Sequence, residues 1–123
     1  MSNPFLDQSR FMRACNQTVG AWNESQFNLY TNLIQEETDE LWVANAAADP
    51  KECLDALIDI LVVTVGAIHS LGADGEGAWN EVMRTNFAKI DPATGRVNKR
   101  EDGKVLKPEG WKPPELDQFI QTR

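Results

Sequence analysis

The sequence predicts an all-α fold, a four-helix-type bundle followed by a C-terminal irregular basic arm. Apolar residues recur at helical spacing in four stretches, and capping and breaking residues bracket those stretches. Residues 84–123 then hold nine of the twelve Lys and Arg residues, alongside six acids. We expect one domain over residues 1–123, with core helices over about 5–90 and the arm over about 91–123.

The four helices are expected over about residues 5–19, 24–47, 50–71 and 76–90. Gly20 ends the first helix. Asn23 is the expected N-cap of the second helix, and Asp49 followed by Pro50 opens the third. "AADP" stops the second helix, because the residue before a proline is disfavoured in the α region. "LGADGEG" ends the third.

The arm combines turn and strand signals. "GRVNKREDGKVLKP" places an Asp102-Gly103 turn between short alternating runs, which predicts a small hairpin or an extended arm. "KPEGWKPPEL" is rich in proline and predicts irregular backbone, and "ELDQFIQ" predicts a last short helix.

Composition and charge exclude several classes of partner. The net charge of −7 argues against nucleic acid and against an anionic membrane surface as partners. The longest apolar run, residues 56–68, is short for a bilayer span and is interrupted by Asp59. Cys15 and Cys53 form no disulfide framework, and "MSNPFLDQSR" lacks the pattern of a secretory signal. We expect a cytoplasmic protein.

Residues 33–63 combine high apolarity with eight acids and a single base, Lys51. On a helical wheel of about 100° per residue, Glu37 and Glu40 fall within the apolar stripe of the second helix, whereas Asp39 falls on its polar face. We therefore expect Asp39 to be solvated, and Glu37 and Glu40 to face the interior.

The third helix carries Glu52, Asp55 and Asp59 in one sector about 60° wide. Because "AADP" is a short link, the two acid-bearing helices are expected to be antiparallel neighbours whose acids face each other. An acid cluster at helical spacing is most often a solvated face. Placement on the apolar stripes of two adjacent helices favours a shared site here.

A divalent cation would resolve the conflict between burial and like charge. Facing carboxylates without a counter-charge have raised pKa values and destabilise the fold. Ligand sets made only of oxygen suit Mg²⁺ or Mn²⁺. Zinc is disfavoured because Cys15, Cys53 and His69 lack ligand spacing, and no Glu-x-x-His pair supports a di-iron site. His69 is expected to be structural.

These residues carry a family resemblance. "EETDE", with Glu36, Glu37 and Glu40, matches the EExxE motif of the all-α nucleoside triphosphate pyrophosphohydrolase superfamily. That superfamily includes MazG-like enzymes, dimeric dUTPases and phosphoribosyl-ATP pyrophosphohydrolases. "TNFAKID" and the basic segment after it resemble the Asn-x-x-Lys and basic-loop segment of phage and bacterial members. The resemblance spans roughly residues 25–114.

The second half of the family pattern is ExxD, and this sequence differs from the usual form of that motif at one position. Alignment on "SLG" places "DALID" at the motif, so that Asp59 takes the Asp role and Asp55 that of the first acid. Ala56 stands where a second acid is usual. Glu52 then lies beside the ligand set rather than within it.

The resemblance implies a helical bundle that assembles as a dimer or a dimer of dimers. It also implies Mg²⁺-dependent cleavage of a nucleotide between its α- and β-phosphates, with dUTP or dCTP as the expected substrate. Glu36 or Glu37 is the expected general base. The expected metal ligands are Glu36, Glu37, Glu40, Asp55 and Asp59.

Two alternatives stay open at this point. One is a pyrophosphohydrolase that acts on phosphoribosyl-ATP or on a modified nucleotide. The other is a catalytically inactive helical dimer in which the metal is structural, a reading that Ala56 keeps open. Pyrophosphate release that depends on Mg²⁺ and on Glu40 would separate the enzyme from the inactive dimer.

Basic and aromatic residues supply candidates for substrate contacts. The expected phosphate or sugar ligands are Asn86, Lys89, Arg100, Lys104 and Lys107. Trp42 and Trp79 are expected to pack in the core or at an interface. Trp22 and Trp111 could either pack or stack on a base.

Overall fold

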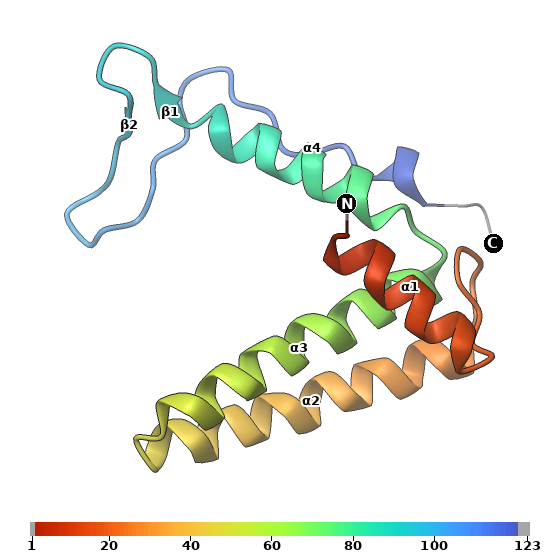
Figure 1. Cartoon of the computed structure of the whole chain (residues 1–123). Helices are drawn as coiled ribbons and strands as arrows, with labels where there is room; N and C mark the ends of the chain where they lie inside the picture. The colour runs from red at the N-terminus through yellow and green to blue at the C-terminus, as the bar shows by residue number, and fades with distance from the viewer. Residues whose placement is uncertain (1, 121–123) are drawn as a thin grey trace. The chain divides into compact units, whose positions relative to one another are not determined.

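The computed structural model describes residues 2–120 and is mostly helical (Figure 1). Within these residues the α-helices are α1 (Pro4–Ala14), α2 (Glu24–Ala46), α3 (Pro50–Leu71) and α4 (Gly75–Phe87). The described residues up to Gly75, together with Ile120, form a first compact unit, and Glu76–Phe119 form a second. The predicted all-α class with four helices is confirmed. The single domain and the closed four-helix bundle stay predictions.

Helices α2 and α3 form an antiparallel hairpin (Figure 1). The Asn23 side chain accepts a hydrogen bond from the Gln26 N–H at 3.2 Å, and the Asp49 side chain accepts one from the Glu52 N–H at 3.2 Å. Both predicted N-caps are therefore confirmed. The short link after α2 brings the acidic segments of the two helices to the same end of the hairpin.

The core of the first unit lies where α1 crosses this hairpin, at the end away from the link. Met12, Tyr30 and Ala67 form its buried apolar cluster. Partly buried side chains packed against the cluster are Val19, Phe27, Leu33, Ile34 and Val63. The ring Nε2 of His69 lies 2.9 Å from the Phe5 carbonyl oxygen, so His69 connects α3 to α1. This contact agrees with the structural role predicted for His69.

The first helix ends earlier than predicted. α1 stops at Ala14, and Asn16 adopts a left-handed φ of 57°. The prediction extended the helix to Val19 because this residue is apolar. In the structure Val19 does pack against the core, but it lies in an irregular link after α1. That link keeps its backbone paired because the Gln26 amide bonds to both the N–H and the carbonyl oxygen of Thr18, at 2.8 and 2.7 Å.

The second unit contains most of α4 and the arm. Its two-stranded antiparallel sheet joins β1 (Ile90–Asp91) to β2 (Arg96–Val97). The fourth helix was predicted to end at residue 90, but α4 ends at Phe87 and Ile90 belongs to β1. An isolated bridge between Lys99 and Val105 spans the predicted Asp102-Gly103 turn. The predicted last helix is a single 3-10 turn, η1 (Asp117–Phe119).

One face of α3 is apolar and uncovered in the single chain. Its exposed side chains are Leu54, Leu57, Ile58, Leu61 and Val62. They follow the i, i+3, i+4, i+7, i+8 spacing of one helix face. By length and composition alone α3 could also cross a membrane, a test that the central helix of a soluble protein passes equally.

Candidate functional site

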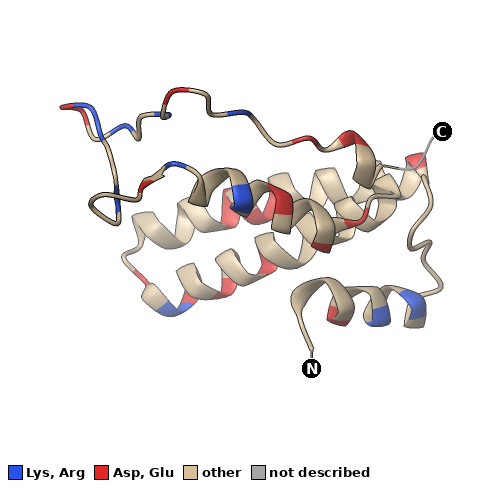
Figure 2. Ribbon diagram, turned by 90° about the horizontal axis from the view of Figure 1, so that it is seen from above, with Lys and Arg blue, Asp and Glu red and all other residues tan. Residues whose placement is uncertain are grey.

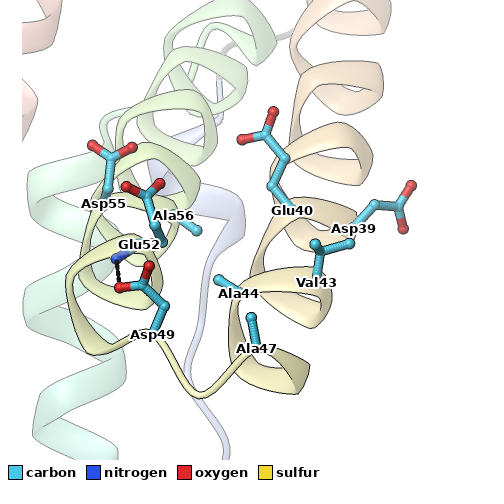
Figure 3. Close-up of a pocket in the computed structure, with 9 residues that line it drawn as sticks. All are labelled: Asp39, Glu40, Val43, Ala44, Ala47, Asp49, Glu52, Asp55 and Ala56. Atoms are coloured by element: carbon cyan, nitrogen blue, oxygen red, sulfur yellow. Dashed lines mark hydrogen bonds between the residues drawn. The ribbon is translucent and has the colours of Figure 1, made fainter.

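The acids of α2 divide only partly as the helical wheel predicts, because Glu40, which was expected to face the interior, is exposed in the single chain. Glu37 is half-buried, and its Oε2 is buried with no hydrogen-bond partner among residues 2–120. Glu40 lies one turn further along, on the side of α2 that faces α3 (Figure 3). Asp39 points away from α3 in the same view and accepts a hydrogen bond from the Gln35 amide at 2.9 Å. Glu36 is exposed.

The acids of α3 lie opposite those of α2. Asp55 and Glu52 project beside Glu40 at the loop end of the hairpin (Figure 3), and Asp59 follows one turn later, half-buried. Asp49 is used differently, because its carboxylate caps the first turn of α3. Lys and Arg gather instead in the arm (Figure 2).

Electrostatics shows which of these acids interact. The pKa of Glu37 is raised from 4.5 to about 7, first by burial and then by the neighbouring carboxylates of Glu40, Asp59 and Asp55. Burial, followed by repulsion from Asp55 and Glu40, also raises the pKa of Asp59. Glu36 contributes to neither shift. Glu37, Glu40, Asp55 and Asp59 are therefore linked electrostatically, and Glu36 is not among the groups that cause either shift.

These shifts predict the pH dependence of stability without metal. Between about pH 4.5 and pH 7 the folded chain retains a proton on Glu37 that the unfolded chain has lost, so the free energy of unfolding falls as the pH rises through this range. Glu37→Gln should remove that part of the slope and be more stable than wild type at pH 8. Urea unfolding in EDTA measures both, with Asp39→Asn as the control. Equal slopes for wild type and Glu37→Gln would contradict the shift.

A hollow of about 530 Å³ opens between the loop ends of α2 and α3. Alanines line its inner wall, namely Ala44, Ala47 and Ala56, and carboxylates line its rim (Figure 3). Ala56 is buried, with 3% of its surface exposed. Ala56 thus forms part of the apolar wall of the hollow, while Glu40, Glu52 and Asp55 lie at its rim.

The donors fit a hard divalent cation by their chemistry. All are carboxylates, which Mg²⁺ prefers. The buried Oε2 of Glu37 accepts no hydrogen bond within residues 2–120, so its lone pairs are available to a cation. Within residues 2–120, no three acidic, His or Cys side chains converge closely enough to hold an ion as they stand.

The predicted basic ligands separate into two places in the second unit. The Lys89 ammonium donates to Asn86 Oδ1 at 3.1 Å, and both Lys89 and Lys107 line a hollow of about 430 Å³. Arg100 instead pairs with Asp102 at 2.7 Å, in the turn that also contains Lys104. The structure brings Asn86, Lys89 and Lys107 together and leaves Arg100 and Lys104 at the hairpin turn.

Two of the four tryptophans make packing contacts, and the other two are exposed. Trp22 packs against Phe27, with ring centroids 5.4 Å apart. The Trp111 indole N–H donates to the Thr85 carbonyl oxygen at 2.8 Å, so this ring is anchored to α4. Trp42 and Trp79 are 66% and 58% exposed in the single chain. The sequence did not reveal the anchoring of Trp111; its only signal was a Gly-Trp pair in a Pro-rich segment.

Comparison with protein families identifies the chain. The family model for phosphoribosyl-ATP pyrophosphohydrolase matches residues 9–86 of the 123. The chain belongs to this family. A comparison with curated proteins gave no match.

Phosphoribosyl-ATP pyrophosphohydrolases are members of the all-α nucleoside triphosphate pyrophosphohydrolase superfamily, so the predicted resemblance is confirmed. The chain is accordingly a pyrophosphohydrolase, a hydrolase acting on phosphoric anhydrides, and the inactive dimer loses support. Enzymes of this family are typically Mg²⁺-dependent. The matched region contains all five predicted metal ligands, and the basic arm lies beyond it.

Proposed function

We propose that the chain cleaves phosphoribosyl-ATP with release of pyrophosphate, as in histidine biosynthesis. The observation that carries the proposal is the facing set Glu37, Glu40, Asp55 and Asp59 in a chain of the phosphoribosyl-ATP pyrophosphohydrolase family. The family favours this alternative over dUTP or dCTP, the substrates that the sequence first suggested. A cytoplasmic location is consistent with a family of soluble metabolic enzymes.

The four facing carboxylates are the proposed Mg²⁺ ligands, with Glu52 beside them at the rim of the hollow. When bound, Mg²⁺ supplies charge neutralisation and orientation at the phosphates. Glu37 is the better placed of the two predicted general bases, because its half-buried side chain lies among the facing carboxylates and its Oε2 has no hydrogen-bond partner within residues 2–120. Glu36 is exposed, and less evidence supports it as a metal ligand or as the general base.

Phosphate contacts are assigned to Lys89 and Lys107, with Asn86 holding the Lys89 ammonium. A lysine ammonium is a compact point charge that suits a phosphate oxygen. Arg100 and Lys104 stay candidates for more distant contacts. Lys89→Ala should therefore raise KM and leave kcat nearly unchanged. Steady-state kinetics check this, and an unchanged KM would remove Lys89 from the site.

The substrate is tested by measuring pyrophosphate release from phosphoribosyl-ATP, dUTP, dCTP and the remaining (d)NTPs. Each is assayed with Mg²⁺, Mn²⁺ or EDTA. We expect the highest kcat/KM for phosphoribosyl-ATP and no turnover in EDTA. A preference for dUTP or dCTP would restore the first expectation for the substrate, and release that continues in EDTA would contradict the metal-dependent site.

The uncovered face of α3 supports a second copy of this chain as the partner that covers it. Five large apolar side chains on one helix face are far more than a monomer usually exposes in one place. On the helical wheel the acids Asp55 and Asp59 border this face. A second copy seated there would shield one side of the acidic site, which is the assembly that the family resemblance implies.

Leu57→Glu should disrupt this assembly, because it places a charge in the middle of the apolar face. Leu57 is half exposed in the single chain, so the variant chain itself is expected to fold. Light scattering coupled to gel filtration should give a dimer or tetramer for wild type and a monomer for Leu57→Glu. Asn32→Glu, at an exposed polar position of α2, is the matched control. A monomeric wild type would contradict the proposed interface.

A further inference from the structure

The second unit holds two lysines against one indole ring. The Lys89 ammonium lies 5.1 Å from the centroid of the Trp111 ring, and the Lys107 ammonium lies 4.8 Å from the same centroid. Lys89 follows the end of α4, whereas Lys107 belongs to the arm. Two cations from separate segments therefore meet at a single electron-rich ring, within the distance at which cation–π attraction operates.

The ring is itself held from two directions. Its indole N–H donates to the carbonyl oxygen of Thr85, a residue of α4 with 2% of its surface exposed. The backbone N–H of Trp111 donates to the Pro108 carbonyl oxygen at 3.1 Å, closing a turn in which Gly110 has a φ of +79°. Trp111 thus fastens the arm to α4, and with the arm held in this way Lys107 lines the same hollow as Lys89.

Both ammonium groups remain available to a ligand. Among residues 2–120, neither lysine has a carboxylate oxygen within 4.0 Å. Asp91 shares their hollow, but its carboxylate already accepts from the Ala93 N–H at 2.9 Å and from the Asn98 amide at 3.4 Å. The hollow therefore holds two cations against one carboxylate, and its net positive charge fits an oxyanion.

We propose that Trp111 is a positioning residue that holds Lys89 and Lys107 as a preformed pair for phosphate oxygens. The assignment of the lysines to phosphate rests on the proposed function; the role of Trp111 rests on the contacts above. The indole itself is not a platform for the nucleotide base. Its N–H is committed to α4 and two ammonium groups already lie against its ring. The contacts of Trp111 therefore favour packing over stacking on a base.

The test compares variants of the full chain by calorimetric titration with inorganic pyrophosphate and by steady-state kinetics. Trp111→Leu removes the ring, and Trp111→Phe keeps a ring without the N–H donor. We expect Trp111→Leu to weaken pyrophosphate binding and to raise KM, each about tenfold, with kcat within about twofold. Trp111→Phe should have a smaller effect. Lys99→Ala, which removes a charge elsewhere in the arm, should match wild type.

Non-additivity distinguishes positioning from a general structural role. If Trp111 acts only through the two lysines, adding Trp111→Leu to the Lys89→Ala/Lys107→Ala variant should cause no further loss of pyrophosphate affinity. A further loss of the same size as in wild type would overturn the proposal, as would wild-type affinity in Trp111→Leu. Thermal unfolding of each variant identifies any that fail to fold. If Trp111→Leu is one of these, Trp111→Phe replaces it in the comparison.

The two proposals can fail separately. A wild-type chain that binds pyrophosphate but hydrolyses no nucleotide would contradict the proposed function and leave the role of Trp111 standing. A wild-type chain that binds neither pyrophosphate nor substrate would overturn the phosphate pair. Turnover of phosphoribosyl-ATP with no effect of Trp111→Leu on KM would overturn the role of Trp111 alone.

Discussion

Glu40→Gln is expected to reduce Mg²⁺-dependent pyrophosphate release about 100-fold or more. The substitution keeps the size of the side chain and removes the charge that faces α3 at the loop end of the hairpin (Figure 3). An amide is a weaker ligand for Mg²⁺ than a carboxylate, and it leaves the facing acids with one fewer negative charge to attract a cation. Release of pyrophosphate from phosphoribosyl-ATP is the measurement.

Loss of activity in Glu40→Gln should come with a gain in metal-free stability. Glu40 raises the pKa values of both Glu37 and Asp59, so its charge opposes ionisation of its neighbours in the folded chain. Removing that charge relieves repulsion, and urea unfolding in EDTA at pH 8 should show a variant at least as stable as wild type. An inactive but stabilised variant cannot be explained as a misfolded one.

Asp39→Asn is the matched control, because it removes the same charge from the adjacent position of α2. Asp39 points away from α3 and bonds to Gln35, so this variant should retain activity within about twofold of wild type. Full Mg²⁺-dependent turnover in Glu40→Gln would show that the facing carboxylates are not the metal site. Equal losses in both variants would point to net charge rather than to position.

The hairpin that carries the site could be predicted because its signals are local. The caps Asn23 and Asp49 and the helix-opening Pro50 determine where α2 and α3 begin, and the wheel separates Asp39 from Glu37 and Glu40. A short link between two long apolar helices leaves an antiparallel pair as the simple arrangement. The facing of the acids follows from those features together.

The remaining features depend on contacts that no local pattern encodes. The end of α1 follows from the pairing of Gln26 with Thr18, residues eight positions apart, and from the left-handed Asn16. The pairing of β1 with β2 and the meeting of Lys89, Lys107 and Trp111 arise from how the arm turns back toward α4. Short, polar segments offer too few apolar positions for their pattern to identify a partner.

Gly66→Ala is expected to destabilise the fold by about 3 kcal/mol. A Cβ atom added at Gly66 would clash with the ring carbons of Tyr30, well inside van der Waals contact. Tyr30 cannot move aside easily, since 5% of its surface is exposed and its hydroxyl donates to the Gln17 side chain. Because Ala is otherwise the better helix former, the whole loss would come from this close packing of α2 on α3. Urea unfolding gives the free energy directly.

A double-mutant cycle with Tyr30→Leu identifies the cause of that loss. The smaller side chain gives up the packing of the ring and its hydrogen bond, so Tyr30→Leu alone is also destabilising. It opens the space that the added methyl group needs, however, and Gly66→Ala should cost much less in the Tyr30→Leu background than in wild type. Additive losses would mean that the ring and the glycine do not limit each other.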